Sequence, residues 1–293
     1  MPDAIRDRWA EWLLERRSGG DAERRNEMSK ETAAFRGRVL DNADLRPDDV
    51  LLDVGAGDGL IAFGALDRLG AAGRVIFSDI SQDLLDHSRS LAQELDVVDR
   101  CEFVIASADD LTPFDDESVD VVTTRSVLIY LDRDGKRRAF EEFHRVLRPG
   151  GRLSIFEPIN KFGYPPPEGW FCGYDLTPIP ELVAKVTTAL SPEGERTLVD
   201  FDERVLLDWT RAAGFELIRL EYEAVLGPGS WLAGSWETVL RSSGNPLAPT
   251  LEEAIDQALT PDEADVFAAH LRPLVEENAG RRDAAFTYLR AVK

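Results

Sequence analysis

Cysteine is scarce in this sequence, because its 293 residues contain only two, Cys101 and Cys172. Two thiols supply neither a disulfide framework nor a cluster of metal ligands, so we expect no metal site. Long apolar runs are missing too, and no apolar stretch follows a basic region near the first residue. The sequence therefore predicts a soluble, cytoplasmic protein without a membrane partner.

Basic residues are also few. Lysine and arginine number 34 against 55 aspartates and glutamates, which gives a formal net charge of −21. A protein that wraps a polyanion needs a concentrated basic surface to displace counterions, and no basic run is present. We therefore expect no nucleic-acid partner. The length allows a sizeable core, as one elaborated domain or a domain with a cap.

The most informative motif is the glycine-rich stretch at residues 51–59, Leu-Leu-Asp-Val-Gly-Ala-Gly-Asp-Gly. A β-prone run leads into closely spaced glycines, and a helical pattern follows. A strand, a glycine turn and a helix N-terminus together form a cradle for a nucleotide cofactor. Dinucleotide sites usually read G-x-G-x-x-G, whereas here the third glycine comes one residue early. The candidate cofactor contacts in this turn are Asp53, Gly55, Ala56, Gly57 and Gly59.

A second predicted strand, residues 74–80, ends in Asp79, twenty residues after Gly59. A carboxylate there can accept hydrogen bonds from both ribose hydroxyls of a nucleotide, and Ile80 can pack on an adenine face. The alternative role for Asp79 is an N-cap of the next helix, a role that Ser81 can also fill. The two roles of Asp79 are compatible.

Later segments follow in the order found in one family, and the chain resembles a class I S-adenosylmethionine-dependent methyltransferase of the small-molecule group. The resemblance covers roughly residues 45–160. The segments that carry it are the third strand at 101–106 with Ser107-Ala108-Asp109-Asp110, the fourth strand at 118–124 with Arg125-Ser126-Val127-Leu128, and Arg-Val-Leu-Arg-Pro-Gly-Gly at 145–151 before a fifth strand at 152–157.

The resemblance implies an α/β fold, a doubly wound, mostly parallel, Rossmann-like sheet of seven strands with an antiparallel last strand and helical cap insertions. It implies S-adenosylmethionine as the cofactor, with Ser107, Ala108 and Asp109 at its adenine edge and Arg125 on the cofactor side of the fourth strand. Family members often carry aspartate where Ser107 stands. The contact to the adenine amino group then passes either to Asp109 or to a backbone carbonyl.

Four stretches divide the chain. Residues 1–36 are predicted as an N-terminal helical cap, broken at Ser18-Gly19-Gly20, and residues 37–157 as the cofactor-binding core. Residues 158–200 form an aromatic insertion near the acceptor site. Residues 201–293 complete the sheet, with a helical insertion at about 228–281 that is either a lid over the acceptor or a dimerisation arm. Within it, Thr250 and Thr260 look like N-caps with capping boxes.

The acceptor site is predicted from aromatic and titratable residues, one in the core and the others in these insertions. The candidates are Tyr130 in the core, and Tyr164, Trp170, Tyr174, Trp231, Trp236 and His270 in the insertions. The alternative for the aromatic residues of 158–200 is a satellite hydrophobic cluster beneath a long loop. The pattern identifies no catalytic residue, because the sequence contains no Ser/His/Asp or Cys/His arrangement.

These observations predict an enzyme that transfers a methyl group from S-adenosylmethionine to a small, partly apolar metabolite at O, N or C. One alternative is a protein that binds this cofactor and regulates or scaffolds without turnover. Another is a nicotinamide-dependent oxidoreductase, against which the glycine spacing and the Arg-Pro-Gly-Gly turn argue.

Overall fold

The computed structural model describes residues 6–191, 196–230 and 232–293. Its chain forms two compact units. One, here called the sheet unit, comprises Lys30–Ile159, Arg196–Glu223 and Phe286–Lys293. The other, here called the helical unit, comprises the described residues of Met1–Ser29, Asn160–Glu195 and Ala224–Ala285. Three of the five boundaries fall within a helix or a strand, namely α2 (Ala22–Ala43), β8 (Glu216–Pro228) and β9 (Arg281–Val292).

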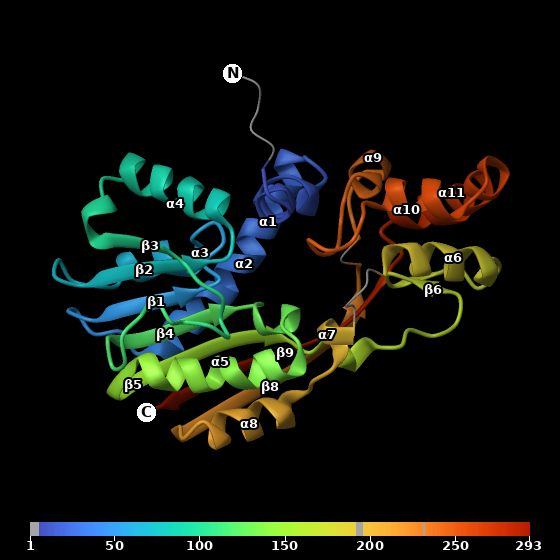
Figure 1. Ribbon diagram of the computed structural model, residues 1–293. Coiled ribbons are helices and arrows are strands. Elements are labelled where there is room, and N and C mark those ends of the chain that lie inside the picture. Colours follow the sequence, from blue (N-terminus) through green and yellow to red (C-terminus); the bar gives the residue numbers. More distant parts are fainter. Residues whose placement is uncertain (1–5, 192–195, 231) are drawn as a thin grey trace. The chain divides into compact units, whose positions relative to one another are not determined.

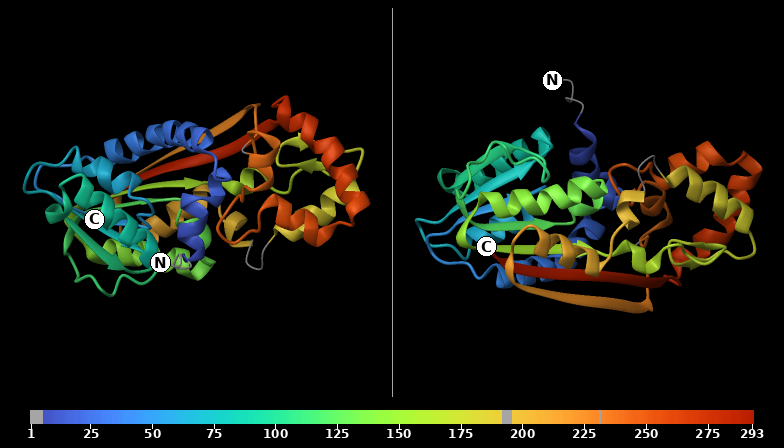
Figure 2. Two further views of the ribbon diagram at one scale, coloured as in Figure 1. Left: turned by 90° about the horizontal axis from the view of Figure 1, so that it is seen from above. Right: turned by 60° about the horizontal axis from the view of Figure 1, so that its bottom comes forward.

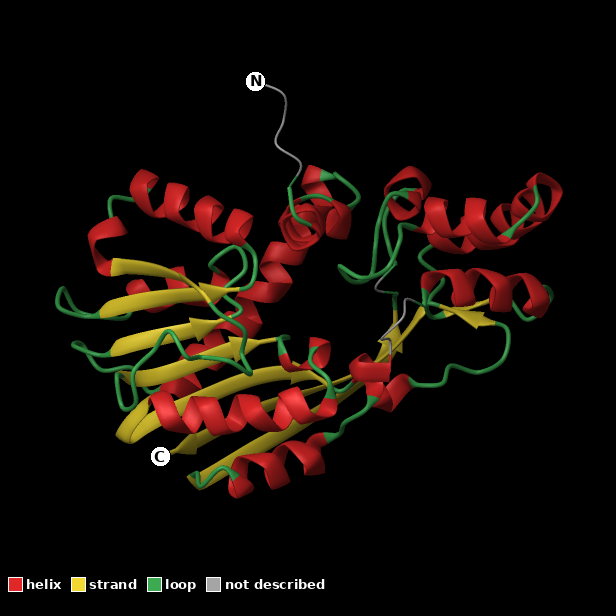
Figure 3. Ribbon diagram, viewed as in Figure 1, coloured by secondary structure: helices red, strands yellow, loops and turns green. Residues whose placement is uncertain are grey.

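The large sheet has seven strands in the order β3-β2-β1-β4-β5-β9-β8. Strands β1 to β5 pair in parallel, and β9 pairs antiparallel with β5. The remaining strands of this sheet are β1 (Val50–Val54), β2 (Arg74–Asp79), β3 (Cys101–Ile105), β4 (Val119–Arg125) and β5 (Leu147–Pro158). This arrangement confirms the predicted fold class, and Figure 3 shows the strands running side by side between helices.

Helices cover both faces of the sheet (Figures 1 and 2). Apolar side chains of α2, α3 (Leu60–Leu66) and α4 (Gln82–Glu94) share one core cluster, which includes Leu40, Ile61, Leu85 and Phe156. Helices α5 (Arg133–Val146) and α8 (Glu203–Ala212) lie on the opposite face, where Phe140 packs near Trp209 with ring centroids 6.3 Å apart. Their apolar stripes bury against β-branched strands, as a doubly wound sheet requires.

The helical unit has a hydrophobic core of its own, formed by residues that include Phe171, Tyr174, Phe267 and Leu271. Its elements are α1 (Arg8–Leu14), α6 (Pro180–Leu190), α9 (Trp236–Leu240), α10 (Leu251–Ala258) and α11 (Pro261–Glu276), with a two-stranded sheet of β6 (Trp170–Phe171) and β7 (Tyr174–Asp175). Both predicted capping boxes are present, one at Thr250 with Glu253 and one at Thr260 with Glu263.

The helical unit thus combines most of three segments that the sequence pattern treated separately: the N-terminal cap up to Ser29, the aromatic insertion from Asn160 to Glu195, and the helical insertion at 228–281, each over its described residues. The remaining residues of the predicted cap and aromatic insertion belong to the sheet unit. A role for the helical insertion as a lid or as a dimerisation arm stays a prediction. The predicted break at Ser18-Gly19-Gly20 separates α1 from α2, and α2 continues beyond residue 36 to Ala43.

Candidate cofactor site at the carboxyl edge of the sheet

The glycine turn connects β1 to α3, and its three glycines have positive φ angles, +69° at Gly55, +57° at Gly57 and +82° at Gly59. At two of these positions close packing is a second reason why the residue is glycine. A Cβ on Gly55 would lie 2.3 Å from Val127 Cγ2, and one on Gly59 would lie 2.4 Å from Phe63 Cε2. The turn therefore brings bare backbone to the carboxyl ends of the parallel strands, where open α/β sheets bind their ligands.

Asp79 ends β2 beside this turn, and its carboxylate is buried. One oxygen accepts a hydrogen bond from the Gly57 N–H at 2.8 Å and the other from the Ser81 N–H at 2.9 Å. The N-cap of α4 is Ser81, whose hydroxyl accepts from the Leu84 N–H at 3.1 Å, so Asp79 does not fill that role. A carboxylate only accepts hydrogen bonds and can accept several through its two oxygens, which suits a pair of ribose hydroxyls.

Ile80 follows Asp79 and leaves 50% of its surface exposed, which is unusual for an apolar residue at the end of a buried strand. An exposed apolar side chain beside a buried carboxylate matches the needs of an adenosine, which combines a flat base with a polar sugar. The bare turn, the acceptor pair of Asp79 and the exposed Ile80 together fit a nucleoside cofactor. Ala56, by contrast, is buried within the turn, where only its backbone can meet a ligand.

Asp53 lies beneath the turn and not on its surface. Its carboxyl is buried, accepts a hydrogen bond from Thr123 Oγ1 at 2.8 Å and accepts another from the Ala62 N–H at 3.2 Å. Gly59, the N-cap residue of α3, has no side chain to cap the helix, and Asp53 supplies an acceptor for one of the unpaired N–H groups. Burial raises the pKa of Asp53 to about 7, although both hydrogen bonds act in the opposite direction.

The exit of β4 faces the same edge. Ser126 has a φ of +56°, a left-handed conformation that non-glycine residues adopt rarely. Just beyond it, the N–H groups of Val127 and Leu128 donate to Glu157 Oε1 at 2.8 and 3.0 Å. Glu157 is fully buried near the end of β5, and its Oε2 has no hydrogen-bond partner among the described residues. Burial raises the pKa of Glu157 to about 7, and the hydrogen bonds from the backbone oppose this rise.

A pH dependence of stability follows from Glu157. Its pKa rises from 4.5 to about 7 on folding, so the folded state holds its proton more tightly than the unfolded chain. The free energy of unfolding should therefore fall as the pH rises from about 4.5 to 7, by roughly 3 kcal/mol from this group. Glu157→Gln, which keeps the accepting oxygen, should remove this part of the pH dependence while Asp53 still contributes its own. Urea unfolding at pH 5 and pH 8 measures the difference.

Glu142→Gln is the matched control, because hydrogen bonding to Arg145 lowers the pKa of Glu142, whereas burial acts to raise it. Removing the Glu142 carboxylate should change the pH dependence in the opposite direction. The variant should lose more stability at neutral pH than in acid. Equal pH dependence in the wild-type protein and in Glu157→Gln would contradict a protonated Glu157.

The residues expected at the adenine edge follow β3. Ser107 Oγ donates to Asp109 Oδ1 at 2.5 Å, and Asp109 Oδ2 accepts from Arg138 Nη2 at 2.7 Å. Ala108 is buried. Asp109 thus accepts hydrogen bonds from two protein side chains. Ser107 follows Ala106, whose N–H donates to the Asp79 carbonyl at 3.1 Å. Arg125 lies with its guanidinium 5.8 Å from the centroid of the Phe156 ring.

The acceptor candidates are dispersed. Tyr130 belongs to the sheet unit, in a short 3₁₀ helix, η3 (Leu128–Tyr130). Tyr174 and Trp236 are buried in the core of the helical unit, where the Tyr174 hydroxyl donates to the Leu232 carbonyl at 2.8 Å. The hydrophobic-cluster alternative thus describes Tyr174, and Trp236, from the later insertion, belongs to the same cluster. Trp231 lies outside the described residues.

The other three candidates are also in the helical unit. Tyr164 is 52% exposed, and Trp170 is half-buried in β6. His270 is exposed on α11, with its Nδ1 2.9 Å from the Val266 carbonyl of the preceding helical turn. A role for His270 in the acceptor site stays a prediction.

Sequence reasoning did not single out Lys136, which is fully buried near the start of α5. Its ammonium donates to the carbonyls of Leu131 at 2.5 Å and Thr197 at 2.9 Å, and it forms an ion pair with Asp200 at 2.8 Å. Burial lowers the pKa of Lys136, opposed by the contact with Asp200. A signal was available, because Lys136 shares the apolar face of the helix with Phe140 and Phe143.

Two negative observations apply to residues 6–191, 196–230 and 232–293. They contain no group of three or more His, Cys, Asp or Glu side chains placed to hold a metal ion. No helix within them has both the length and the apolar character that crossing a membrane needs.

The strand order and the glycine turn define an α/β protein that binds a nucleotide-type cofactor. Residues 51–151 match a family model described as a methyltransferase domain. The ubiquinone/menaquinone biosynthesis C-methyltransferase UbiE of Vibrio vulnificus is 30% identical over 182 residues, which cover 61% of this chain and 68% of that protein. The demethylmenaquinone methyltransferase of Clavibacter sepedonicus is 37% identical over 171 residues, 56% of this chain and 64% of that protein.

Among solved structures, geranyl diphosphate methyltransferase in complex with S-adenosylmethionine superposes with a TM-score of 0.52. It is 17% identical, and the match covers 94% of this chain and 92% of the other. That likeness supports the fold. Together with the sequence relatives, it shows that the chain belongs to the class I S-adenosylmethionine-dependent methyltransferases, as the resemblance implied. The protein is an enzyme of this class, and S-adenosylmethionine is its cofactor.

Proposed function

We propose that this methyltransferase acts on a small, partly apolar metabolite, and that a ring carbon of a quinol is the first acceptor to test. The observation that carries the proposal is the identity of 30–37% to enzymes named for quinone methylation. The matched parts cover 56–61% of this chain. The acceptor and the methylated atom are therefore proposed from relatives and not from a side chain of known role.

The proposed cofactor contacts are grouped around the glycine turn. Asp79 would accept the ribose hydroxyls, Ile80 would pack on the adenine, and Gly57 would let the cofactor approach the backbone. Asp53 and Glu157 would act indirectly, because Asp53 holds the N-terminus of α3 and Glu157 holds the backbone after β4. Ser107, Ala108, Asp109 and Arg125 complete the proposed site.

S-adenosylmethionine supplies a methyl group that its sulfonium already activates strongly. The task of the protein is then to hold the acceptor in line with the methyl–sulfur bond and to exclude water. Orientation of this kind can supply roughly 7–11 kcal/mol of the barrier. An oxygen acceptor would in addition need deprotonation, to which a general base typically contributes about 10²–10⁴-fold.

The acceptor class is tested with methyl-labelled S-adenosylmethionine and the full chain. Three acceptors of similar size are compared: a prenylated naphthoquinol with an open ring carbon, a prenylated phenol and a prenylated amine. We expect label in the quinol, attached to carbon and accompanied by S-adenosylhomocysteine. Label in the phenol or the amine would support an apolar acceptor but would assign methylation to O or N instead of carbon. Transfer to none of them, by a protein that binds S-adenosylmethionine, would overturn the acceptor class.

Asp79→Ala should weaken S-adenosylmethionine binding by about 1.5–3 kcal/mol, the range for hydrogen bonds to a charged group. Ser81→Ala is its control, because Ser81 lies two residues further along, caps α4 and has no proposed contact with the cofactor. Titration calorimetry measures affinity, and urea unfolding measures stability. If both variants lost stability alike and neither lost affinity, Asp79 would be a structural residue of the turn.

A further inference from the structure

Strand β8 is the last strand in the order of the large sheet, so among the described residues it has a neighbouring strand, β9, on one side only. Figure 1 shows it at the border of the sheet. Most of its residues are exposed. Leu217 has a φ of +47°, so the regular stretch of β8 within the sheet unit is 218–223. An exposed border strand presents N–H and C=O groups to which another strand can be added.

The odd-numbered side chains of this stretch form a charged row that is tied to α2. Arg219 Nη2 lies 2.9 Å from Glu221 Oε1. Arg38 of α2 donates to Glu221 Oε2 and to Glu223 Oε2, both at 2.7 Å. The guanidinium of Arg38 also lies 3.7 Å from the centroid of the Tyr288 ring on β9, which holds it over the sheet. The row therefore has a fixed order, with one cation followed by two anions.

The even-numbered side chains form an apolar row on the other face of the strand, because successive residues of a strand point to opposite faces. Ile218 and Leu220 are half-buried, and Tyr222 is exposed. Burial and the nearby carboxylate of Glu203 in α8 raise the pKa of Tyr222, which places this row on the α8 face of the sheet. The apolar row ends at the border of the sheet, where an added strand would extend it.

The order of these residues complements itself when it is reversed. Two copies of the chain that pair antiparallel along β8 are related by a two-fold axis perpendicular to the sheet, and the axis passes between one residue and its own copy. With the axis at Leu220, Arg219 lies opposite Glu221 of the second copy, and Ile218 lies opposite Tyr222 of the second copy. Each pair occurs twice, so the charged row meets opposite charges and the apolar row meets apolar side chains.

The neighbouring registers fit less well. An axis at Arg219 or at Glu221 would set that residue opposite its own copy, and like charges directly opposite each other destabilise a strand pair. An axis at Tyr222 would set Glu221 opposite Glu223 twice. An axis at the first residue of the regular stretch would form no ion pair. Charged residues on a border strand usually prevent pairing, whereas in the register centred on Leu220 they favour it.

We propose that the chain forms a two-fold symmetric dimer in which the β8 strands of two copies pair antiparallel, centred on Leu220, and join the two sheets into one. The partner is a second copy, because it supplies at each position the charge or the apolar side chain that this stretch requires. The interface lies in the sheet unit. It is distinct from the helical insertion at 228–281, which the sequence predicted as a lid or a dimerisation arm.

The charge pairs are tested by sedimentation velocity on the full chain over a range of concentrations, where we expect a dimer of the wild-type protein. Arg219→Glu should raise the dissociation constant of the dimer at least about tenfold, because two attractive pairs become repulsive. Glu221→Arg should do the same. An equimolar mixture of the two variants should restore the dimer, because every cross-strand pair then joins opposite charges.

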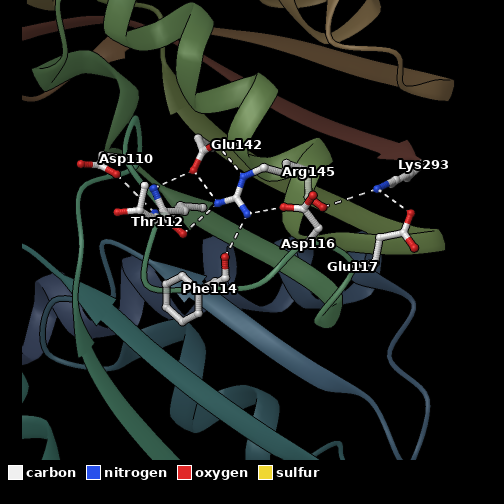
Figure 4. Close-up of polar contacts among 9 residues, drawn as sticks. Asp110, Thr112, Phe114, Asp116, Glu117, Glu142, Arg145 and Lys293 are labelled. Carbon is white, nitrogen blue, oxygen red and sulfur yellow. Dashed lines mark hydrogen bonds and ion pairs between the residues drawn. The ribbon is translucent and has the colours of Figure 1, made fainter.

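Glu117→Arg is the control for the change in net charge, which it shares with Glu221→Arg. Glu117 is exposed and lies 3.5 Å from Lys293 Nζ, in the turn before β4 and outside β8 (Figure 4). This variant should dimerise as the wild-type protein does. Circular dichroism checks the folding of each variant, since Glu221 also pairs with Arg38.

Single cysteines test the register without changing the charges, so they decide the matter should Glu221→Arg fail to fold. Mild oxidation should join two Leu220→Cys chains, because these side chains lie directly opposite each other. Ile218→Cys or Tyr222→Cys alone should stay uncrosslinked, because the two copies of each lie four residues apart, about 13 Å. A mixture of those two variants should cross-link. The wild-type protein gives the background from Cys101 and Cys172.

Four results would overturn the proposal. The first is a wild-type chain that stays monomeric at every concentration. The second is a dimer that Arg219→Glu leaves unchanged, since the interface would then lie elsewhere. The third is a mixture of the two charge variants, both folded, that stays monomeric. The fourth is cross-linking of Ile218→Cys alone, with none of Leu220→Cys, which would contradict the register.

Discussion

Gly57→Val should abolish S-adenosylmethionine binding and leave the chain folded. The φ of Gly57 is +57°, which costs an L-residue about 1–2 kcal/mol, more when the side chain is β-branched. A valine side chain would also project from the turn that the cofactor must approach. Any backbone shift that relieved the strain would move the Gly57 N–H away from Asp79, its partner at 2.8 Å. We expect at least about a hundredfold loss of affinity, equivalent to roughly 3 kcal/mol.

Gly150→Val separates this effect from general backbone strain. Gly150 also has a positive φ, +77°, and a Cβ there would meet no atom within 4 Å. It lies in the sheet unit, in β5 beside the turn before Arg152. Calorimetric titration of both variants, with far-ultraviolet circular dichroism as the measure of folding, decides the matter. Equal losses of affinity would assign the effect to strain, and unchanged affinity in Gly57→Val would remove the glycine turn from the cofactor site.

Lys136→Ala should reduce the free energy of unfolding by about 3–5 kcal/mol, the range for removing one partner of a buried ion pair. The substitution would leave the Leu131 and Thr197 carbonyls without their donor and would create a cavity beneath α5. Lys136→Met should cost less, because methionine fills the volume and only the polar contacts are lost. Urea unfolding monitored by tryptophan fluorescence measures both values.

Lys185→Ala is the exposed counterpart. Lys185 pairs with Glu263 on α11, and the two side chains are 46% and 32% exposed. Exposed pairs of this kind contribute about 0–1 kcal/mol. The structural role assigned to Lys136 would be wrong if its removal cost no more than that of Lys185.

The parts of the fold that the sequence predicted are those coded by neighbouring residues. The strand, glycine turn and helix at residues 51–66 form one continuous signal, and so do the capping boxes at Thr250 and Thr260, where donor and acceptor are three residues apart. The sequence allowed Asp79 to bind a ribose, to cap α4, or to do both. The structure excludes the cap, because the hydroxyl of Ser81 accepts from the Leu84 N–H of α4, whereas Asp79 accepts from the N–H of Ser81.

The rest depended on partners distant in the chain. Asp53 meets Thr123 and Glu157 meets Val127, contacts that no local pattern encodes. The aromatic residues of the insertions were ambiguous for a related reason, since an aromatic side chain in a long loop can line a pocket or fill a core equally well. Tyr174 and Trp236 fill the core of the helical unit, which three separate segments of the chain must come together to build.

That composition of the helical unit has a consequence for how the chain folds during synthesis. Trp12 Nε1 donates to the carbonyl of Ser243 at 3.0 Å, and Arg16 pairs with Glu253, so these early residues meet partners that are made 231 and 237 residues later. Strand β9 is made after β5 and β8 and lies between them in the sheet. At a ribosomal rate of about 5–20 residues per second, the early segments must wait roughly ten seconds or more for their partners. Neither unit can close until these later residues have been made, so the growing chain carries apolar surfaces that stay uncovered throughout that interval.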